Sequence, residues 1–478
     1  MYRMLINGKL VSAAETFDVV NPATGRVFAA APKGSSDHVK SAIEAARGGF
    51  KVWSRMPQSE RSELILKAAS VIEANRLDLE LLLSKEQGKP LSGAVSETST
   101  AISMFRQAAE VTIPIKTVKE TSRHTLQVVR KSVGVVVGIT PWNYPLSLGC
   151  GKIARAIGYG NSVILKPSPF TPLTSLLLGE ILKDVFPAGI INVLTGDDQR
   201  GEISVGQQLV ESPDVNLVSF TGSGPTGKRI MAACATNITR VLLELGGNDP
   251  AIVLPDADVA HAANGIFQMT VANSGQICCA IKRVYVHESL FETFVEHVTR
   301  LARDAVSSIG EGTNDGVKMG PLNNKMQLER VKDLVADAIT SGATVHAGAK
   351  TPSHTNPEGF FFEPTILTNI REGIKIVDEE QFGPIMPIMS YSSEEEVIRR
   401  ANDSPYGLGA SVWGRNATDL NRIACQLESG IVWTNQHAVL REGGSFGGLK
   451  QSGFRHEGDF AEADLESYTE MQTQKLSK

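Results

Sequence analysis

Short runs of β-branched and other apolar residues, separated by helix-like segments, constrain the fold of this chain more than any other feature. The segments 171–185 and 200–211 have helical character and lie between such runs. Strands that alternate with helices at this spacing are typical of a parallel, doubly wound sheet with right-handed connections, and such sheets bind ligands at the carboxyl ends of their strands. The runs are 133–139, 162–165, 191–194, 215–220 and 240–244.

The segments on either side of this alternation predict further parts of the molecule. Residues 4–30 indicate an antiparallel hairpin region, and residues 36–110 carry long helical patterns. The stretch 116–132 is polar and rich in Thr, Val, Arg and Lys, which favours a ribbon over a core strand. A second α/β pattern follows to about residue 455, and the turn-forming residues 246–250 before it suit a hinge.

Composition excludes several classes of protein. The 478 residues are 42% hydrophobic and 21% charged, which indicates a globular chain rather than a disordered one. The net charge of −5 argues against nucleic-acid and anionic-membrane partners. The five cysteines form no CxxC motif, and no apolar run is long enough to span a bilayer. We therefore expect a cytoplasmic chain with free thiols, no metal site and no membrane partner.

Four positions could carry chemistry, and each has a structural alternative. Gly222-Ser-Gly-Pro-Thr-Gly227 matches G-x-G-x-x-G after a strand, although Pro225 removes one N–H from a phosphate cradle. Glu244 ends a strand, where it could be a general base or a cap. Cys278 could be a nucleophile or, with Cys279, a small buried hydrophobe. Asn143 lies in a proline-framed turn and could donate to an oxyanion or only stabilise the turn.

Seven motifs together resemble the aldehyde dehydrogenase superfamily. They occur in that family's order and at its spacing, so the resemblance covers essentially the whole chain. The motifs are Thr140-Pro-Trp-Asn-Tyr-Pro145, Leu165-Lys-Pro-Ser168, Phe220-Thr-Gly-Ser223, Leu243-Glu-Leu-Gly-Gly247, Gly275-Gln-Ile-Cys278, Glu379-Glu-Gln-Phe-Gly-Pro384 and Phe446-Gly-Gly-Leu-Lys-Gln-Ser-Gly453.

The resemblance implies an α/β fold with a Rossmann-like NAD(P)-binding domain, a catalytic domain and a small β oligomerisation ribbon. It also implies a homodimer or homotetramer that is built through the ribbon. The expected division is 1–115 with 134–246 for the cofactor domain, 247–455 for the catalytic domain, and 116–133 with 456–478 for the ribbon and tail.

The resemblance further implies oxidation of an aldehyde to an acid with NAD or NADP. Cys278 would be the nucleophile, Glu244 the base that activates water, and Asn143 an oxyanion donor. A CoA-acylating semialdehyde dehydrogenase is an alternative, but such relatives generally lack a base at the position of Glu244. A non-catalytic homologue is a further alternative, and it should have lost at least one of the three reactive residues.

Cofactor contacts follow from the same motifs. The resemblance implies that Lys166 binds the adenine ribose region, Ser223 approaches the pyrophosphate and Glu380 holds the nicotinamide ribose. The full expected set is Thr140, Pro141, Trp142, Lys166, Ser168, Pro169, Phe220, Gly222, Ser223, Leu245, Gly246, Glu380 and Phe382.

Two departures from the family pattern concern specificity. NAD-preferring relatives often carry a glutamate at the position of Pro169, so we expect NADP to be tolerated here beside NAD. Gly149, Gly151 and Ala272 are small where relatives are often bulky, which predicts a roomy tunnel for aryl or branched aldehydes. Side chains from 436–446 could refill that space, and Arg441 among them could pair with a substrate carboxylate or be a solvated loop arginine.

Overall fold

The five expected parallel strands form the centre of an eight-stranded sheet in the computed structural model, which describes residues 2–197, 204–439 and 443–478. Their spatial order is β9-β8-β7-β10-β11, so the winding reverses between β7 and β10. A ligand crevice is expected outside the carboxyl ends at such a switch point. The strands are β7 (Val135–Ile139), β8 (Ser162–Lys166), β9 (Ile191–Val193), β10 (Leu217–Thr221) and β11 (Arg240–Glu244).

Antiparallel strands extend this sheet at both edges. The hairpin of β1 (Met4–Ile6) and β2 (Lys9–Val11) turns at Asn7-Gly8, where both φ angles are positive. At the other edge β21 (Gly453–Phe454) pairs with β11, so the chain returns to the first sheet near its C-terminus. A second hairpin, β3 (Glu15–Asn21) with β4 (Arg26–Lys33), completes the predicted hairpin region.

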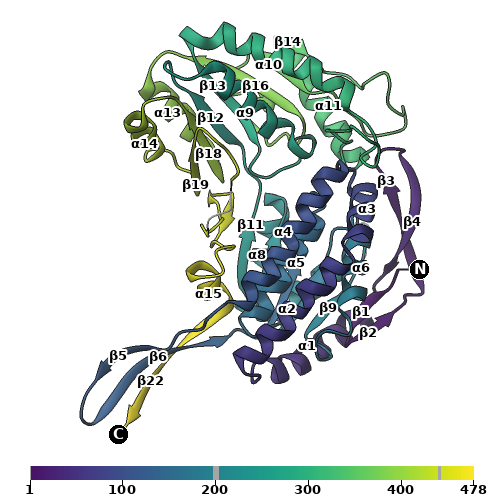
Figure 1. The fold of residues 1–478 in the computed structure, drawn as a ribbon, viewed down its shortest axis with the longest axis vertical. Coiled ribbons are helices and arrows are strands. Elements are labelled where there is room, and N and C mark those ends of the chain that lie inside the picture. The colour runs from purple at the N-terminus through teal and green to yellow at the C-terminus, as the bar shows by residue number, and fades with distance from the viewer. Residues whose placement is uncertain (1, 198–203, 440–442) are drawn as a thin grey trace.

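Helices cover both faces of this sheet (Figure 1). The predicted helix at 171–185 is confirmed as α6, and the segment 200–211 contains α7, with its first residues outside the described ranges. The helices are α1 (Ser36–Trp53), α2 (Gln58–Ala74), α3 (Arg76–Gln87), α4 (Leu91–Ala109), α5 (Pro145–Gly158), α6 (Leu173–Leu182), α7 (Val205–Glu211) and α8 (Gly224–Ala235).

The second lobe is built on a seven-stranded sheet in the order β14-β15-β16-β13-β12-β18-β19, in which β14 is the antiparallel edge. Its strands are β12 (Asp249–Val253), β13 (Ile281–His287), β14 (Thr344–Ala347), β15 (Thr365–Thr368), β16 (Ile385–Tyr391), β18 (Gly409–Trp413) and β19 (Ile431–Thr434). Its helices are α9 (Val259–Val271), α10 (Phe291–Ala305), α11 (Lys325–Thr340), α12 (Lys375–Asp378), α13 (Glu394–Asn402) and α14 (Ala417–Ala424). A two-stranded sheet joins β17 (Tyr406–Gly407) to β20 (Leu449–Lys450).

A three-stranded antiparallel ribbon projects from the first lobe, as the sequence predicted (Figure 1). It consists of β5 (Lys116–Glu120), β6 (His124–Ser132) and the C-terminal β22 (Thr469–Ser477). The helix α15 (Glu462–Tyr468), which precedes β22, packs against α5 instead, and Tyr468 is buried in the core of the first lobe. Within the described ranges, no helix has the length and apolar content to cross a membrane.

Candidate active site

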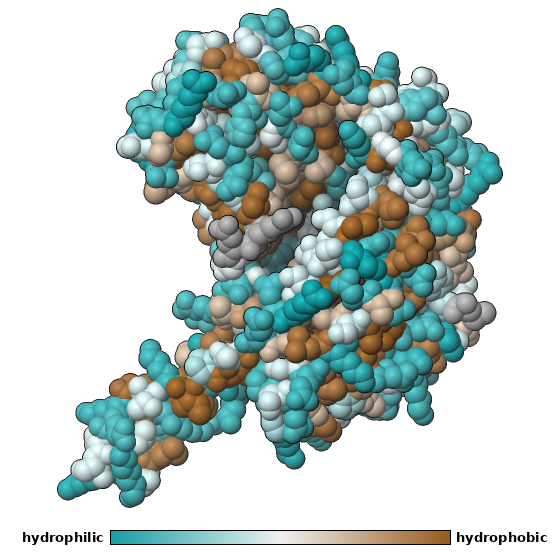
Figure 2. Space-filling model, in the orientation of Figure 1, coloured by the Kyte–Doolittle hydropathy of each residue, from teal (hydrophilic) through white to brown (hydrophobic). Residues whose placement is uncertain are grey.

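The surface is hollowed between the two lobes (Figure 2), on the side where four parallel strands of the first sheet end. Thr140 follows β7, Lys166 ends β8, Thr221 ends β10 and Glu244 ends β11. Four motif segments that are far apart in the sequence therefore meet at one sheet edge. Opposite them, the second lobe contributes the cysteine loop between α9 and β13.

The cysteine loop begins in a strained backbone conformation. The short helix η1 (Ala272–Gly275) contains positive φ angles at Asn273 (48°) and Ser274 (58°), followed by Gly275 (74°). A Cβ on Gly275 would lie 2.1 Å from the carbonyl oxygen of Gly383, so only glycine fits. The Ser274 hydroxyl donates to Gly320 O (2.7 Å), and the Gln276 side chain donates to Asn273 O (2.7 Å). Such strain persists only where neighbours hold it, and it clusters at functional sites.

Cys278 is half-buried, and its surroundings favour the thiolate. A hydrogen bond from the Cys279 thiol and the charge of Lys282 lower the pKa of Cys278 below its ordinary value, although burial opposes them. Lys282 Nζ donates to the carbonyl oxygens of Ile277 (2.9 Å) and Cys278 (2.6 Å). This lowering favours the thiolate form that a cysteine nucleophile needs.

Asn143 lies next to the cysteine loop. Its side-chain amide donates to Gln276 O (2.9 Å), two residues before Cys278. The amide nitrogen carries a second N–H, and the buried Oδ1 has no hydrogen-bond partner among the described residues. The expected oxyanion donor and nucleophile are thus brought together by one direct contact between the two loops.

Glu244 is 3% exposed, and neither carboxyl oxygen has a hydrogen-bond partner within the part of the chain that the structure describes. Burial raises the pKa of Glu244 well above its ordinary value, and the charges of Glu457 and Cys278 raise it further. This environment favours the neutral form of the carboxyl group, and the ionised form would be a stronger base than an ordinary glutamate.

A charged cluster lies behind Glu244, and sequence reasoning missed it. Lys152 Nζ donates to Ser219 Oγ (2.9 Å) and lies 3.9 Å from Glu457 Oε1, and Arg155 lies 3.6 Å from Glu457 Oε2. Burial opposes ionisation of Glu457, but the charges of Lys152 and Arg155 keep its pKa below the ordinary value. The charge of Glu457 raises the pKa of Glu244, and the charges of Lys152 and Arg155 lower it.

The turn after β10 has the form of a pyrophosphate site. Ser223 is the N-cap of α8, but its hydroxyl donates to Thr226 Oγ1 (3.1 Å), and no side chain among the described residues caps this helix. Gly222 N donates to Glu244 O (3.0 Å), which joins this turn to β11. A helix start with free N–H groups attracts anions.

The residues expected around the nicotinamide end also gather in the crevice. Glu380 Oε1 accepts from Gly247 N (3.1 Å), and a Cβ on Gly246 would lie 2.2 Å from Glu380 Oε2. Phe382 has a φ of 53°, and its ring meets that of Trp142 edge-on at 5.2 Å. These contacts pair Glu380 with the backbone at Gly246 and Phe382 with Trp142, so four expected cofactor residues lie in two contacting pairs.

The remaining expected cofactor residues lie in or directly beside these loops. Thr140 and Lys166 are buried, and Thr140 Oγ1 has no hydrogen-bond partner in the described ranges. Phe220 and Leu245 pack against Gly222 and Gly227 of the glycine turn. Pro141 precedes Trp142, and Ser168 and Pro169 follow β8.

The small residues Gly149 and Gly151, which were predicted to widen a substrate tunnel, lie against other side chains. A Cβ on Gly149 would meet the Leu165 side chain at 3.3 Å, so Gly149 faces the sheet, and that part of the tunnel prediction is wrong. A Cβ on Gly151 would lie 2.8 Å from Arg155 Nη1 and 3.2 Å from Met104 Sδ, so other side chains already fill the space beside it. The suggestion for Arg441 lies outside the described residues.

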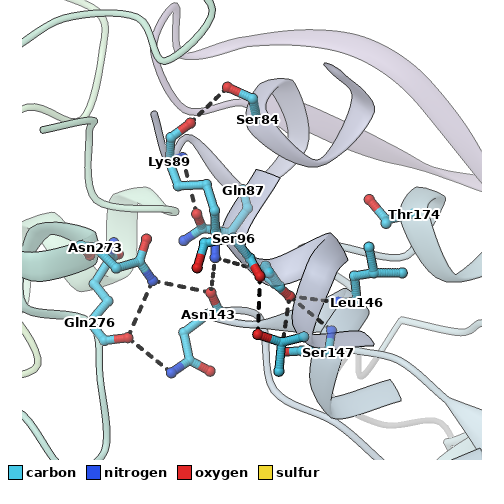
Figure 3. A network of polar contacts seen from close by, with 12 residues as sticks. Ser84, Gln87, Lys89, Ser96, Asn143, Leu146, Ser147, Thr174, Asn273 and Gln276 are labelled. Atoms are coloured by element: carbon cyan, nitrogen blue, oxygen red, sulfur yellow. Dashed lines mark hydrogen bonds and ion pairs between the residues drawn. The ribbon is translucent and has the colours of Figure 1, made fainter. Parts of the chain in front are cut away.

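Buried Lys89 and Glu97, which contact the Asn143 loop, also escaped prediction (Figure 3). A glutamate among the small and apolar residues of α4 is a signal that could have pointed to them. No cluster of three or more potential metal ligands occurs in residues 2–197, 204–439 and 443–478.

A doubly wound sheet, a helix start that no described side chain caps, and a contact between Asn143 and the loop of Cys278 suit a dinucleotide-dependent oxidoreductase. Residues 10–474 match the aldehyde dehydrogenase family. The chain belongs to this family, and its activity is the NAD(P)-dependent oxidation of an aldehyde.

Similar proteins include the mitochondrial aldehyde dehydrogenase of Leishmania tarentolae, at 37% identity over 98% of this chain and 93% of that one. The NADP⁺ succinate-semialdehyde dehydrogenase of Escherichia coli (strain K12) is 36% identical, over 98% and 96% of the two chains. The NAD⁺ complex of an aldehyde dehydrogenase from Bacillus cereus superposes with a TM-score of 0.95 at 36% identity, over 100% and 96%.

Proposed function

We propose that Cys278, Glu244 and Asn143 perform the oxidation in two stages. The Cys278 thiolate attacks the aldehyde carbon, a C–S bond forms, and the carbonyl oxygen becomes an oxyanion. Asn143 Nδ2 and the Cys278 N–H would donate to it, and losing one such donor costs about 3 kcal/mol of barrier. The observation that carries the proposal is the contact between the Asn143 amide and the loop of the low-pKa Cys278.

The second stage releases the acid. When bound, NAD(P)⁺ supplies the acceptor for the hydride that leaves the substrate carbon as its C=O bond re-forms. The product on Cys278 is a thioester. Glu244, once ionised, takes a proton from water, the water oxygen attacks the thioester carbon, and the C–S bond breaks to return the thiolate. A buried carboxyl with no competing hydrogen bond among the described residues suits this role.

Several observations support cofactor binding on the first lobe, at the side that faces the second lobe. The start of α8 lacks a side-chain cap among the described residues and would hold the pyrophosphate at Gly222 and Ser223. Thr140 Oγ1 and Thr221 Oγ1 at the strand ends, which have no hydrogen-bond partner among the described residues, would gain partners. Lys166, Ser168 and Pro169 would face the adenine ribose, and Glu380, Phe382 and Trp142 the nicotinamide end.

The packing around Gly151 bears on the predicted roomy tunnel for aryl or branched aldehydes. Arg155 and Met104 fill the space that its missing side chain leaves, which argues against a wide tunnel at this point. Ala272 and the described part of 436–446 would define the remaining wall. We propose an aldehyde substrate, and the panel of substrates to be tested must include aliphatic, aryl and ω-carboxy aldehydes.

We also propose the division into 1–115 with 134–246, 247–455, and 116–133 with 456–478. The two sheets and the ribbon support it, although β21 joins the first sheet. A homodimer or homotetramer is proposed because the ribbon exposes apolar residues. All five cysteines are free thiols, which supports a cytoplasmic location.

Initial rates of NADH and NADPH formation across that aldehyde panel test the function, with the wild type and Cys278→Ala side by side. We expect turnover that disappears in the variant. Turnover that persists in Cys278→Ala would contradict the nucleophile assignment. A requirement for added CoA would instead favour the acylating alternative. Cofactor binding without turnover of any aldehyde would favour a non-catalytic homologue.

A further inference from the structure

A buried ion pair, which joins Lys89 between α3 and α4 to Glu97 within α4, holds the backbone beside Asn143 (Figure 3). Lys89 follows the left-handed Gly88 that ends α3, and Glu97 lies in α4. Lys89 Nζ bonds to Glu97 Oε2, donates to the main-chain oxygen of Asn143 (3.0 Å), and lies 3.9 Å from the centre of the Tyr144 ring. The ammonium group is therefore held between a carboxylate, a carbonyl and an aromatic ring.

The second oxygen of Glu97 fixes the other end of the same loop. Glu97 Oε1 accepts from Leu146 N (2.9 Å) and Ser147 N (3.0 Å), the first amides of α5. Tyr144 at the N-cap position makes no side-chain cap bond within the described residues. Glu97 therefore replaces the cap and places its charge at the positive end of the helix dipole.

The pair is also connected to the cysteine loop. Asn143 O accepts a second hydrogen bond, from Asn273 Nδ2 (3.1 Å). Asn323 N donates to Gln276 Oε1 (2.8 Å), and Asn323 Nδ2 donates to Gln87 O (3.2 Å), two residues before Lys89. The segment 87–97, the Asn143 loop and the cysteine loop are thus parts of one buried hydrogen-bond network.

We propose that Lys89 and Glu97 are positioning residues that aim the Asn143 amide at the oxyanion. The inference rests on the proposed role of Asn143. Asn143 O accepts from Lys89 and Asn273, and the amides of Leu146 and Ser147 donate to Glu97, so hydrogen bonds on both sides fix the peptide from which the Asn143 amide projects. A misplacement of about 1 Å at a reacting centre can cost about a hundredfold in rate, so a pair that never touches substrate can govern the chemical step.

The test uses a chromogenic 4-nitrophenyl ester, because its attack by Cys278 needs the same oxyanion donors but neither cofactor nor a known aldehyde. The C–S bond forms, the C–O bond breaks, and 4-nitrophenolate leaves in a burst whose rate is the acylation rate. Lys89→Met leaves Glu97 buried and unpaired, so it is studied beside Lys89→Met/Glu97→Gln, which is neutral and keeps an oxygen acceptor for Leu146 and Ser147. Lys85→Met, an exposed lysine one turn earlier, is the matched control.

We expect both Lys89 variants to slow the burst by about tenfold to a hundredfold, with unchanged NADH affinity by fluorescence titration and with Lys85→Met equal to wild type. In an Asn143→Ala background, adding Lys89→Met should change the rate by less than about twofold, because coupled residues are not additive. Thermal unfolding of each variant reports whether it is folded.

Two results would overturn the inference. One is a wild-type burst rate in the double variant. The other is the same loss with and without Asn143, which would assign the pair to stability alone. If Asn143→Ala itself leaves the burst unchanged, the oxyanion assignment fails as well, and that result separates the failure of the proposed function from the failure of the positioning role.

Discussion

At the scale of single residues, the charge on Cys278 depends on two neighbours in its own loop. The Cys279 thiol donates to Cys278, and Lys282 adds a positive charge, and both lower the pKa of Cys278. We expect Cys279→Ala and Lys282→Met to raise that pKa. At a pH below the pKa of Cys278, the alkylation rate with iodoacetamide should then fall by up to about tenfold for a rise of one pKa unit, because only the thiolate reacts.

The pH profile of alkylation is measured in a Cys425→Ala background, since Cys425 is exposed and would also react. Burial raises the pKa of Cys234 to about 11, so this thiol stays silent. Lys325→Met at the exposed start of α11 is the control for loss of a lysine. A profile that does not move in either loop variant would show that neither neighbour acts on the sulfur.

Glu244 carries the opposite shift, since burial raises its pKa. A base must be ionised, so the steady-state rate should rise with pH as Glu244 loses its proton, above the ordinary range of a glutamate. Glu244→Gln should abolish this rise and slow turnover by about a hundredfold or more, while the first NADH per subunit still forms in a burst. Stopped-flow absorbance separates the two phases, with Glu395→Gln as the exposed control. Loss of the burst along with turnover would show that Glu244 acts before the thioester forms.

At the scale of elements, the loop after β8 bears on the choice of cofactor. Pro169 stands where a carboxylate would repel a 2′-phosphate, so Pro169→Glu should weaken NADPH binding by about tenfold or more and leave NADH binding little changed. Fluorescence titration measures both affinities, and Pro169→Gln controls for side-chain size. Equal NADPH affinity in the Glu variant and the wild type would rule this explanation out.

The strands of the first sheet were predictable to within about two residues. A run of β-branched residues is a local signal that can be read without knowing which strands it pairs with. The motif residues around Cys278, Asn143 and Glu244 could likewise be proposed from the sequence, because each lies in a short contiguous signature. Lys89 and Glu97 could not be proposed in this way, because the contacts that suggest their role are hydrogen bonds to residues 49–54 positions away in the sequence. The small residue at Gly149 misled for the same reason, because only the packing shows that it faces Leu165.

At the scale of the whole molecule, Cys278, Glu244 and Asn143 all come from the same chain. The ribbon, however, exposes apolar side chains to solvent (Figure 2). Val118 is 54% and Met471 is 70% exposed, on the two outer strands β5 and β22. Edge strands with exposed apolar residues are templates for pairing. In the proposed homo-oligomer, a second copy of this chain would cover Val118 and Met471.

Val118→Glu and Met471→Glu should therefore shift the sedimentation coefficient towards that of a single chain, while Lys119→Gln on the same ribbon should not. Because Cys278, Glu244 and Asn143 all come from one chain, kcat/KM per subunit should stay within a few-fold of wild type. An unchanged sedimentation coefficient would remove the ribbon from the interface. A folded single chain that has lost its activity would instead show that the partner copy completes or steadies the site, because every group proposed for catalysis is still present in it.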